Sequence, residues 1–162
     1  FEPANRPVLV IRRNPFEEDS SGVRYLTKLS NVLIADHYWE RDSAKKWSIQ
    51  GIDGELEWRA LLQIANVSMN IPSMSTIDSL MCGTPVVNIG FDATGHENLK
   101  IQHIIHAPFV KEFEKSKFVR TFTDLSEFKS EFKRILSLKQ EASEEEIQKS
   151  LDIIKCSIEA YV

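Results

Sequence analysis

Short runs of apolar residues alternate along this chain with amphipathic stretches, and this alternation decides the fold class to expect. Each run has the length of a buried strand and is bounded by proline, glycine or polar residues. The runs lie at residues 7–11, 31–35, 47–49, 67–69 and 85–89. Strands that alternate with helices indicate an α/β fold, so we expect one Rossmann-like parallel sheet with helices on both faces.

The expected helices follow from apolar residues at a spacing of three and four. Trp58 and Leu62 belong to one such face, and a second short helix over residues 77–81 ends at Gly83, a residue suited to the end of a helix. Two C-terminal helices are each preceded by a capping box; the pairs are Asp124 with Glu127 and Ser143 with Glu146. Residues 92–118 give no clear assignment.

Length and composition limit the classes of function. A chain of 162 residues suits one domain, residues 1–162, and because it starts at Phe1 rather than Met we expect it to be a piece of a longer protein. The net charge of −4 argues against nucleic acid as a partner. Two cysteines without a Cys-x-x-Cys pair indicate a reducing, cytoplasmic compartment. No apolar stretch approaches the ~20 residues of a transmembrane helix.

In a parallel sheet, ligands bind beyond the carboxyl ends of the strands. The functional search therefore narrows to the residues that follow each expected strand. These segments are 12–15, 36–38, 50–53, 70–78 and 88–98.

The segment from 65 to 92 is the most informative of these. Ser73, Ser75 and Thr76 lie where a helix is expected to begin, and the unpaired N–H groups and dipole of a helix start favour an anion. Asp78 is expected just inside the first turn, where its carboxylate can accept hydrogen bonds from sugar hydroxyls. The alternative is structural: a serine only caps the helix, and Asp78 only complements its dipole.

Four further residues are candidates for catalysis. Arg12 and Arg13 end the first expected strand, and either can neutralise the charge that grows on a leaving diphosphate. Their alternative role is a surface ion pair with a nearby glutamate. His96 and Glu97 follow the strand at 85–89 and are candidates for acid–base work, although a single loop histidine is more often only solvated.

We expect no metal site. His103 and His106 have the spacing of two ligands on a helix, but no third ligand lies near them in the sequence, and no cysteine is at a useful distance.

Residues 72–89 read Pro-Ser-Met-Ser-Thr-Ile-Asp-Ser-Leu-Met-Cys-Gly-Thr-Pro-Val-Val-Asn-Ile. This run resembles the donor-binding half of GT-B fold glycosyltransferases, in particular those of bacterial surface-polysaccharide synthesis and the CDP-glycerol glycerophosphotransferase-like enzymes. The strand that ends in Arg12, Arg13 and Asn14 is similar to a family strand that ends in Arg-x-His-Pro. The resemblance spans roughly the whole chain, but only residues 73–92 are specific.

The resemblance implies a nucleotide-activated sugar or alcohol as the donor, with no cofactor. Its phosphates are expected at Ser73, Ser75 and Thr76, and its ribose at Asp78. The base-binding region is expected at Gln50, Gly51 and Asp53, after the third strand. Asp78 stands where the family usually has the longer glutamate, and Asn14 stands where it often has histidine, so no proton-transfer role is carried to that position.

The resemblance also implies what lies outside the chain. A GT-B enzyme closes its cleft between two domains, so the N-terminal domain of the same protein is the expected partner, and the isolated chain is expected to be inactive. If it acts in polysaccharide synthesis, as the resemblance implies, we expect the full-length enzyme in the cytoplasm, with peripheral association at the inner face of the membrane.

Two other functions remain open at this point. One is half of a nucleotide-sugar epimerase, which places phosphates on the same helix start. The other is a non-enzymatic flavodoxin-like or receiver-like domain, which needs an acidic pair after the first strand, where this chain has Arg12 and Arg13. Neither a Gly-x-x-x-x-Gly-Lys loop nor a Gly-x-Gly-x-x-Gly motif is present.

Overall fold

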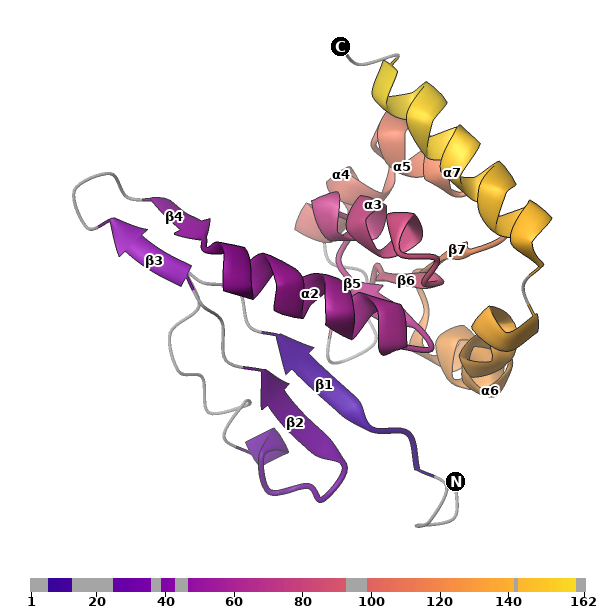
Figure 1. The fold of residues 1–162 in the computed structure, drawn as a ribbon. Coiled ribbons are helices and arrows are strands. Elements are labelled where there is room, and N and C mark those ends of the chain that lie inside the picture. The colour runs from indigo at the N-terminus through magenta and orange to yellow at the C-terminus, as the bar shows by residue number, and fades with distance from the viewer. Residues whose placement is uncertain are drawn as a thin grey trace. The chain divides into compact units, whose positions relative to one another are not determined.

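The computed structural model describes residues 6–12, 25–35, 39–42, 47–92, 99–141 and 143–159. It shows a mixed α/β fold, as the alternation of apolar runs predicts (Figure 1). The single parallel sheet that was expected is not found: the described strands form two small parallel sheets and one antiparallel pair. The chain divides into an N-terminal unit, Phe1–Trp58, and a C-terminal unit, Arg59–Val162.

The N-terminal unit holds two pairs of strands. β1 (Leu9–Arg12) pairs in parallel with β2 (Val32–Ala35), and β3 (Trp39–Asp42) pairs antiparallel with β4 (Trp47–Gln50). The helix α2 (Ile52–Ile64) begins in this unit and ends in the next.

Two expectations for this region were wrong. The strand at 47–49 was expected in the parallel sheet, but it forms a hairpin with β3, because strands close in sequence can pair antiparallel without a crossover helix. The strand at 7–11 was expected to be buried on both faces. Among the described strands β1 pairs only with β2, and Val8, Leu9 and Val10 are 63%, 37% and 41% exposed.

The C-terminal unit contains a parallel three-stranded sheet in the order β5-β6-β7. Its strands are β5 (Ser68–Asn70), β6 (Val86–Ile89) and β7 (Val119–Phe122). The first two confirm the strands predicted at 67–69 and 85–89, whereas β7 was not predicted. The helices are α3 (Met74–Met81), α4 (Leu99–Ile105), α5 (Pro108–Phe113), α6 (Leu125–Glu141) and α7 (Glu144–Glu159).

Helices contact both faces of this sheet, and the alternation of side chains along β6 explains how. Val86 packs in a cluster with residues of α3, α5 and α7, among them Ile77 and Phe113. Val87 points to the opposite face and packs with Phe122 and with Ile135 of α6. The central strand is therefore buried on both sides.

The predicted helix ends are confirmed. Gly83 follows α3 with a φ of +69°, a left-handed conformation that glycine adopts without strain. In the box before α7, the N–H of Ser143 donates to Glu146 Oε2 at 2.9 Å, and the N–H of Glu146 donates to Ser143 Oγ at 3.3 Å. Before α6, the N–H of Glu127 donates to Asp124 Oδ1 at 2.8 Å.

None of the helices in the described ranges is both long enough and apolar enough to cross a membrane.

Candidate functional site

A row of polar side chains crosses the three-stranded sheet at its carboxyl edge. Asn70 at the end of β5 lies opposite Asn88 of β6, which lies opposite Thr121 of β7. Two residues earlier on the same face, Val86 lies opposite Val119, and both are buried. The face under α3 thus changes from apolar to polar within one step of the pleat.

Thr76, in the first turn of α3, contacts two members of this row, Asn88 and Asn70. It is 1% exposed, and its Oγ1 lies 3.2 Å from Asn88 Oδ1 and 3.3 Å from Asn70 Oδ1. The N–H of Ser73 approaches the same hydroxyl at 3.5 Å. On its other side, Asn88 points Nδ2 toward Thr121 Oγ1, also at 3.5 Å. The four side chains form one network.

The helix start above this network is the place where the sequence predicts phosphate binding. Ser73 is exposed and Ser75 is half-buried, so both can meet a ligand. The N–H groups of Met74 and Ser75 have no carbonyl one turn earlier in the helix. Thr76 differs from the prediction, because its hydroxyl is buried against the sheet and already has protein partners.

Asp78 was expected just inside the first turn of the helix, and this was wrong. The helix begins at Met74, so Asp78 is its fifth residue, and the first turn contains no acidic residue. The side chain is half-buried. It lies one helical turn after Met74, which places both on the same side of α3.

The candidate Arg12 has partners within the N-terminal unit. Its Nη2 donates to the carbonyl oxygen of Gly54 at 3.3 Å, and its guanidinium lies over the ring of Trp58, 4.7 Å from the centroid. These contacts join the end of β1 to one face of α2. They give Arg12 a structural function whether or not it meets a ligand.

The expected base-binding residues surround the start of α2. Gln50 ends β4, Gly51 precedes the helix, and Asp53 lies exposed in its first turn with Glu55. Acidic side chains there complement the positive end of the helix dipole. The candidates Arg13, His96 and Glu97 lie outside the described residues.

The structure therefore places Ser75, Thr76 and Asp78 on α3 and Ser73 directly before it, all in the C-terminal unit. Arg12 and Asp53 belong to the N-terminal unit. Sequence reasoning assigned no role to Asn70, Asn88 or Thr121. A signal was present for the first two, since Asn70 directly follows one apolar run, Asn88 interrupts another, and asparagine is depleted in strands.

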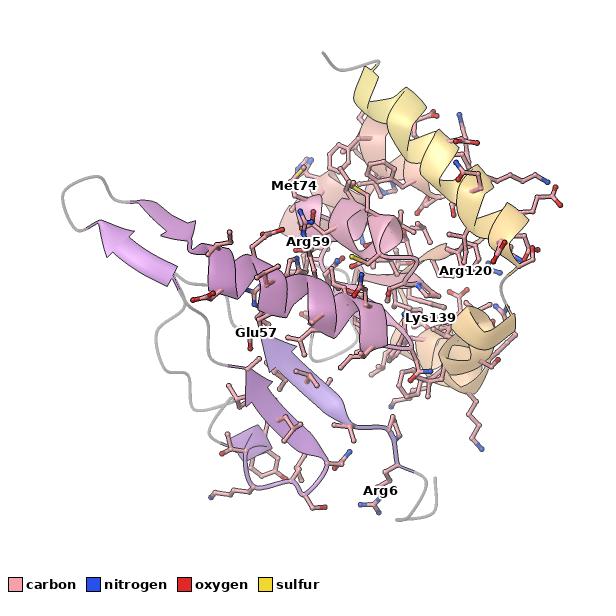
Figure 2. All side chains as sticks on the ribbon, in the orientation of Figure 1. Arg6, Glu57, Arg59, Met74, Arg120 and Lys139 are labelled. Carbon is pink, nitrogen blue, oxygen red and sulfur yellow. The ribbon has the colours of Figure 1, made fainter. Side chains whose placement is uncertain are left out.

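Away from the start of α3, a polar cleft of about 420 Å³ lies between β7 and α6. Its lining includes Arg120, labelled in Figure 2, which makes no ion pair in the part of the chain that the structure describes. Beside it, Arg134 is paired with Glu131. The cleft mixes both signs of charge and indicates no single class of ligand.

No cluster of three or more histidine, cysteine, aspartate or glutamate side chains is arranged to hold a metal ion within the described segments. Comparison with protein-family models, with curated proteins and with solved structures gives no match to this chain.

Proposed function

We propose that this chain is the donor-binding domain of a GT-B glycosyltransferase, which uses a nucleotide-activated sugar or alcohol in surface-polysaccharide synthesis. One observation carries the proposal. The residues that resemble the family form a strand, a turn, a helix and a parallel strand, from β5 through α3 to β6. The helix α3 starts at the carboxyl edge of the sheet, where α/β proteins bind ligands.

The chemistry of this edge suits a diphosphate. Ser73 and Ser75 carry hydroxyls beside the N–H groups of Met74 and Ser75, which begin α3, and the helix dipole favours negative charge there. We assign the donor phosphates to these groups, with Thr76 supporting the turn from inside. The ribose is assigned to Asp78, and the base to the region of Gln50, Gly51 and Asp53.

Transfer requires the N-terminal domain of the full-length enzyme, because the groups that stabilise the transition state must stand on both sides of the reacting bond. We expect the isolated chain to transfer no sugar. Arg12, Arg13, His96 and Glu97 are the proposed catalytic candidates in this domain. Turnover of a nucleotide sugar by the isolated chain would contradict the assignment as a donor half.

The test is a titration of the chain with CDP or UDP, followed by amide chemical shifts. We expect a Kd of about 0.1–1 mM, since half of the cleft is absent. Shifts should gather at 73–78 and at 50–53. Asp78→Asn should weaken the nucleotides and leave free pyrophosphate nearly unaffected, because the carboxylate is assigned to the ribose.

Ser75→Ala tests the proposed phosphate contact, and Ser130→Ala is its matched control. Ser130 is an exposed serine of α6 whose Oγ donates to a backbone carbonyl, so only Ser75→Ala should weaken binding, by about two- to tenfold for one neutral hydrogen bond. Shifts confined to 96–106, or none at millimolar nucleotide, would contradict the proposal. An epimerase would bind the same diphosphate, and assays of the full-length protein with and without an acceptor separate the two reactions.

A further inference from the structure

We propose that Asn88 and Thr76 are positioning residues, which fix the first turn of α3 on the carboxyl edge of the sheet through a buried hydrogen-bond network. A capping residue alone would hold the turn from its exposed side. Here the turn is also held from the side of the sheet, by a side chain of the central strand.

The burial of Asn88 is the first argument. Asn88 is 0% exposed near the carboxyl end of β6, and the residues before it, Val86 and Val87, are also buried. A buried amide costs free energy unless its hydrogen bonds are made, so an apolar residue would be the simpler way to stabilise this strand. Buried polar networks that are satisfied instead specify a single arrangement of the groups that they join.

The order of the contacts is the second argument. Asn88 Nδ2 points to Thr121 Oγ1 at 3.5 Å, Asn88 Oδ1 accepts from Thr76 Oγ1 at 3.2 Å, and Thr76 Oγ1 accepts from the N–H of Ser73 at 3.5 Å. The path runs without a break from β7 to the backbone that precedes α3. A shift of Asn88 would therefore reach Ser73, fifteen positions earlier in the sequence.

Asn70 contacts the network only through its side-chain oxygen. Its Oδ1 lies 3.3 Å from Thr76 Oγ1, and a hydroxyl has one proton, so Thr76 donates to Asn70 or to Asn88 at any moment. The Nδ2 of Asn70 is buried and has no hydrogen-bond partner in the described structure. We therefore place the main link at Asn88, whose Nδ2 has a partner in Thr121 Oγ1.

The consequence for donor binding rests on the proposed function: the network would hold the N–H groups of the first turn in the geometry that a diphosphate needs. Thr76 then acts through the backbone and does not touch the phosphate. This separates it from Ser73 and Ser75, which are the proposed ligands.

The deciding experiment measures the unliganded chain. Asn88→Leu removes the amide without contact to Ser73, and we expect it to shift the Ser73 amide resonance and to speed its hydrogen exchange. Thr76→Val should do the same, while Thr76→Ser keeps the hydroxyl and should restore the wild-type values. Thr84→Val is the matched control: Thr84 is 0% exposed and hydrogen-bonded to the carbonyl oxygen of Leu62, but it follows the other end of α3.

The same variants are then titrated with CDP or UDP. We expect Thr76→Val and Asn88→Leu each to weaken binding about two- to tenfold, and the double variant to be no weaker than the worse single one, because both interrupt one path. A Ser73 amide unmoved by Asn88→Leu overturns the inference. So does a loss of binding in Thr76→Val with none in Asn88→Leu, which would make Thr76 a direct ligand. If the wild type binds no nucleotide while the Ser73 amide responds, the proposed function fails and the positioning network stands.

Discussion

The ammonium of Lys139 lies 2.9 Å from the carbonyl oxygen of Ala65, seventy-four residues earlier in the chain. It also lies 2.5 Å from the carbonyl oxygen of Gln63 and 3.1 Å from Thr84 Oγ1. The last carbonyls of a helix have no donors within it, and a cation suits the negative end of its dipole. Lys139 of α6 therefore closes the C-terminal end of α2 (Figure 2).

We expect Lys139→Met to lower the free energy of unfolding of the C-terminal unit by about 1.5–3 kcal/mol, as for the loss of hydrogen bonds to a charged group. Lys129→Met is the control, since Lys129 is an exposed lysine of the same helix, and its effect should stay within about 0.5 kcal/mol. Urea unfolding followed by circular dichroism measures both. Equal effects of the two variants would show that the carbonyl contacts contribute nothing.

The ion pair and hydrogen bond of Glu146 make the free energy of unfolding depend on pH. Glu146 forms an ion pair with Lys117 and caps α7 by bonding the N–H of Ser143, and these contacts lower its pKa from 4.5 to about 2. Because the folded state holds the proton less tightly than the unfolded state, the contribution is fully present above pH 4.5 and is lost as the pH falls toward 2.

Glu146→Gln should therefore destabilise the chain at pH 7 and differ little from wild type near pH 2. Glu144→Gln removes the same charge from the first residue of α7, where Glu144 makes no ion pair with any described residue. Its effect at pH 7 should be smaller. Thermal unfolding of the three proteins from pH 2 to 7 measures this, and a pH-independent gap between Glu146→Gln and wild type would contradict it.

Gly90 has no room for a side chain. A Cβ at this position would lie 2.9 Å from the carbonyl oxygen of Phe122, which accepts the Gly90 N–H bond that joins β6 to β7. We expect Gly90→Ala to cost about 1–3 kcal/mol through strain in the sheet.

Gly83 provides the contrast, because a Cβ there would meet only Ile147, at 3.9 Å. The cost of Gly83→Ala should come from its positive φ alone, about 1–2 kcal/mol, and Gly83→Asn should recover part of it. Chemical denaturation of the three variants tests this, and a harmless Gly90→Ala would show that the two strands separate at that point.

Arg12 offers a prediction specific to the N-terminal unit. Arg12→Lys keeps the charge but loses the planar stacking on Trp58, and should destabilise this unit by about 0.5–1 kcal/mol. Arg6→Lys is the control on an exposed arginine. All three tryptophans, Trp39, Trp47 and Trp58, lie in this unit, so we follow its unfolding in urea by their fluorescence. If Arg12→Lys leaves the midpoint of urea unfolding unchanged, the stacking of Arg12 on Trp58 does not stabilise this unit.

Local signals in the sequence predict a large part of this fold. The runs at 67–69 and 85–89, the glycine after α3, the capping box before α7 and the cap of Asp124 before α6 each act over a few residues. Each is found where expected. β7 was missed because Val119-Arg-Thr-Phe122 has no continuous apolar run. It becomes a strand by pairing with β6, which buries Val119 and Phe122 on opposite faces. A strand that forms only by pairing with a distant segment cannot be predicted from its own residues.

The same limit applies to the candidate site. The start of α3 near Ser73 follows from turn residues and helical spacing, so the sequence predicts it. That Thr76 faces inward depends on what the sheet presents beneath it, and that in turn depends on the register of Asn70 with Asn88. Hydroxyl groups at a helix start look alike in the sequence, and only the fold separates those that face solvent from those that face the sheet.

The change from the apolar pair Val86 and Val119 to the polar pair Asn88 and Thr121 makes the length of β6 matter as much as its composition. Inserting one residue into β6 would exchange its two faces, because neighbouring side chains point to opposite sides. The amide of Asn88 would then enter the apolar cluster around Phe122 and Ile135, and Val87 would take its place beside Thr76. Conservative exchanges within this strand are compatible with the fold, whereas a change of one codon in its length breaks both faces at once.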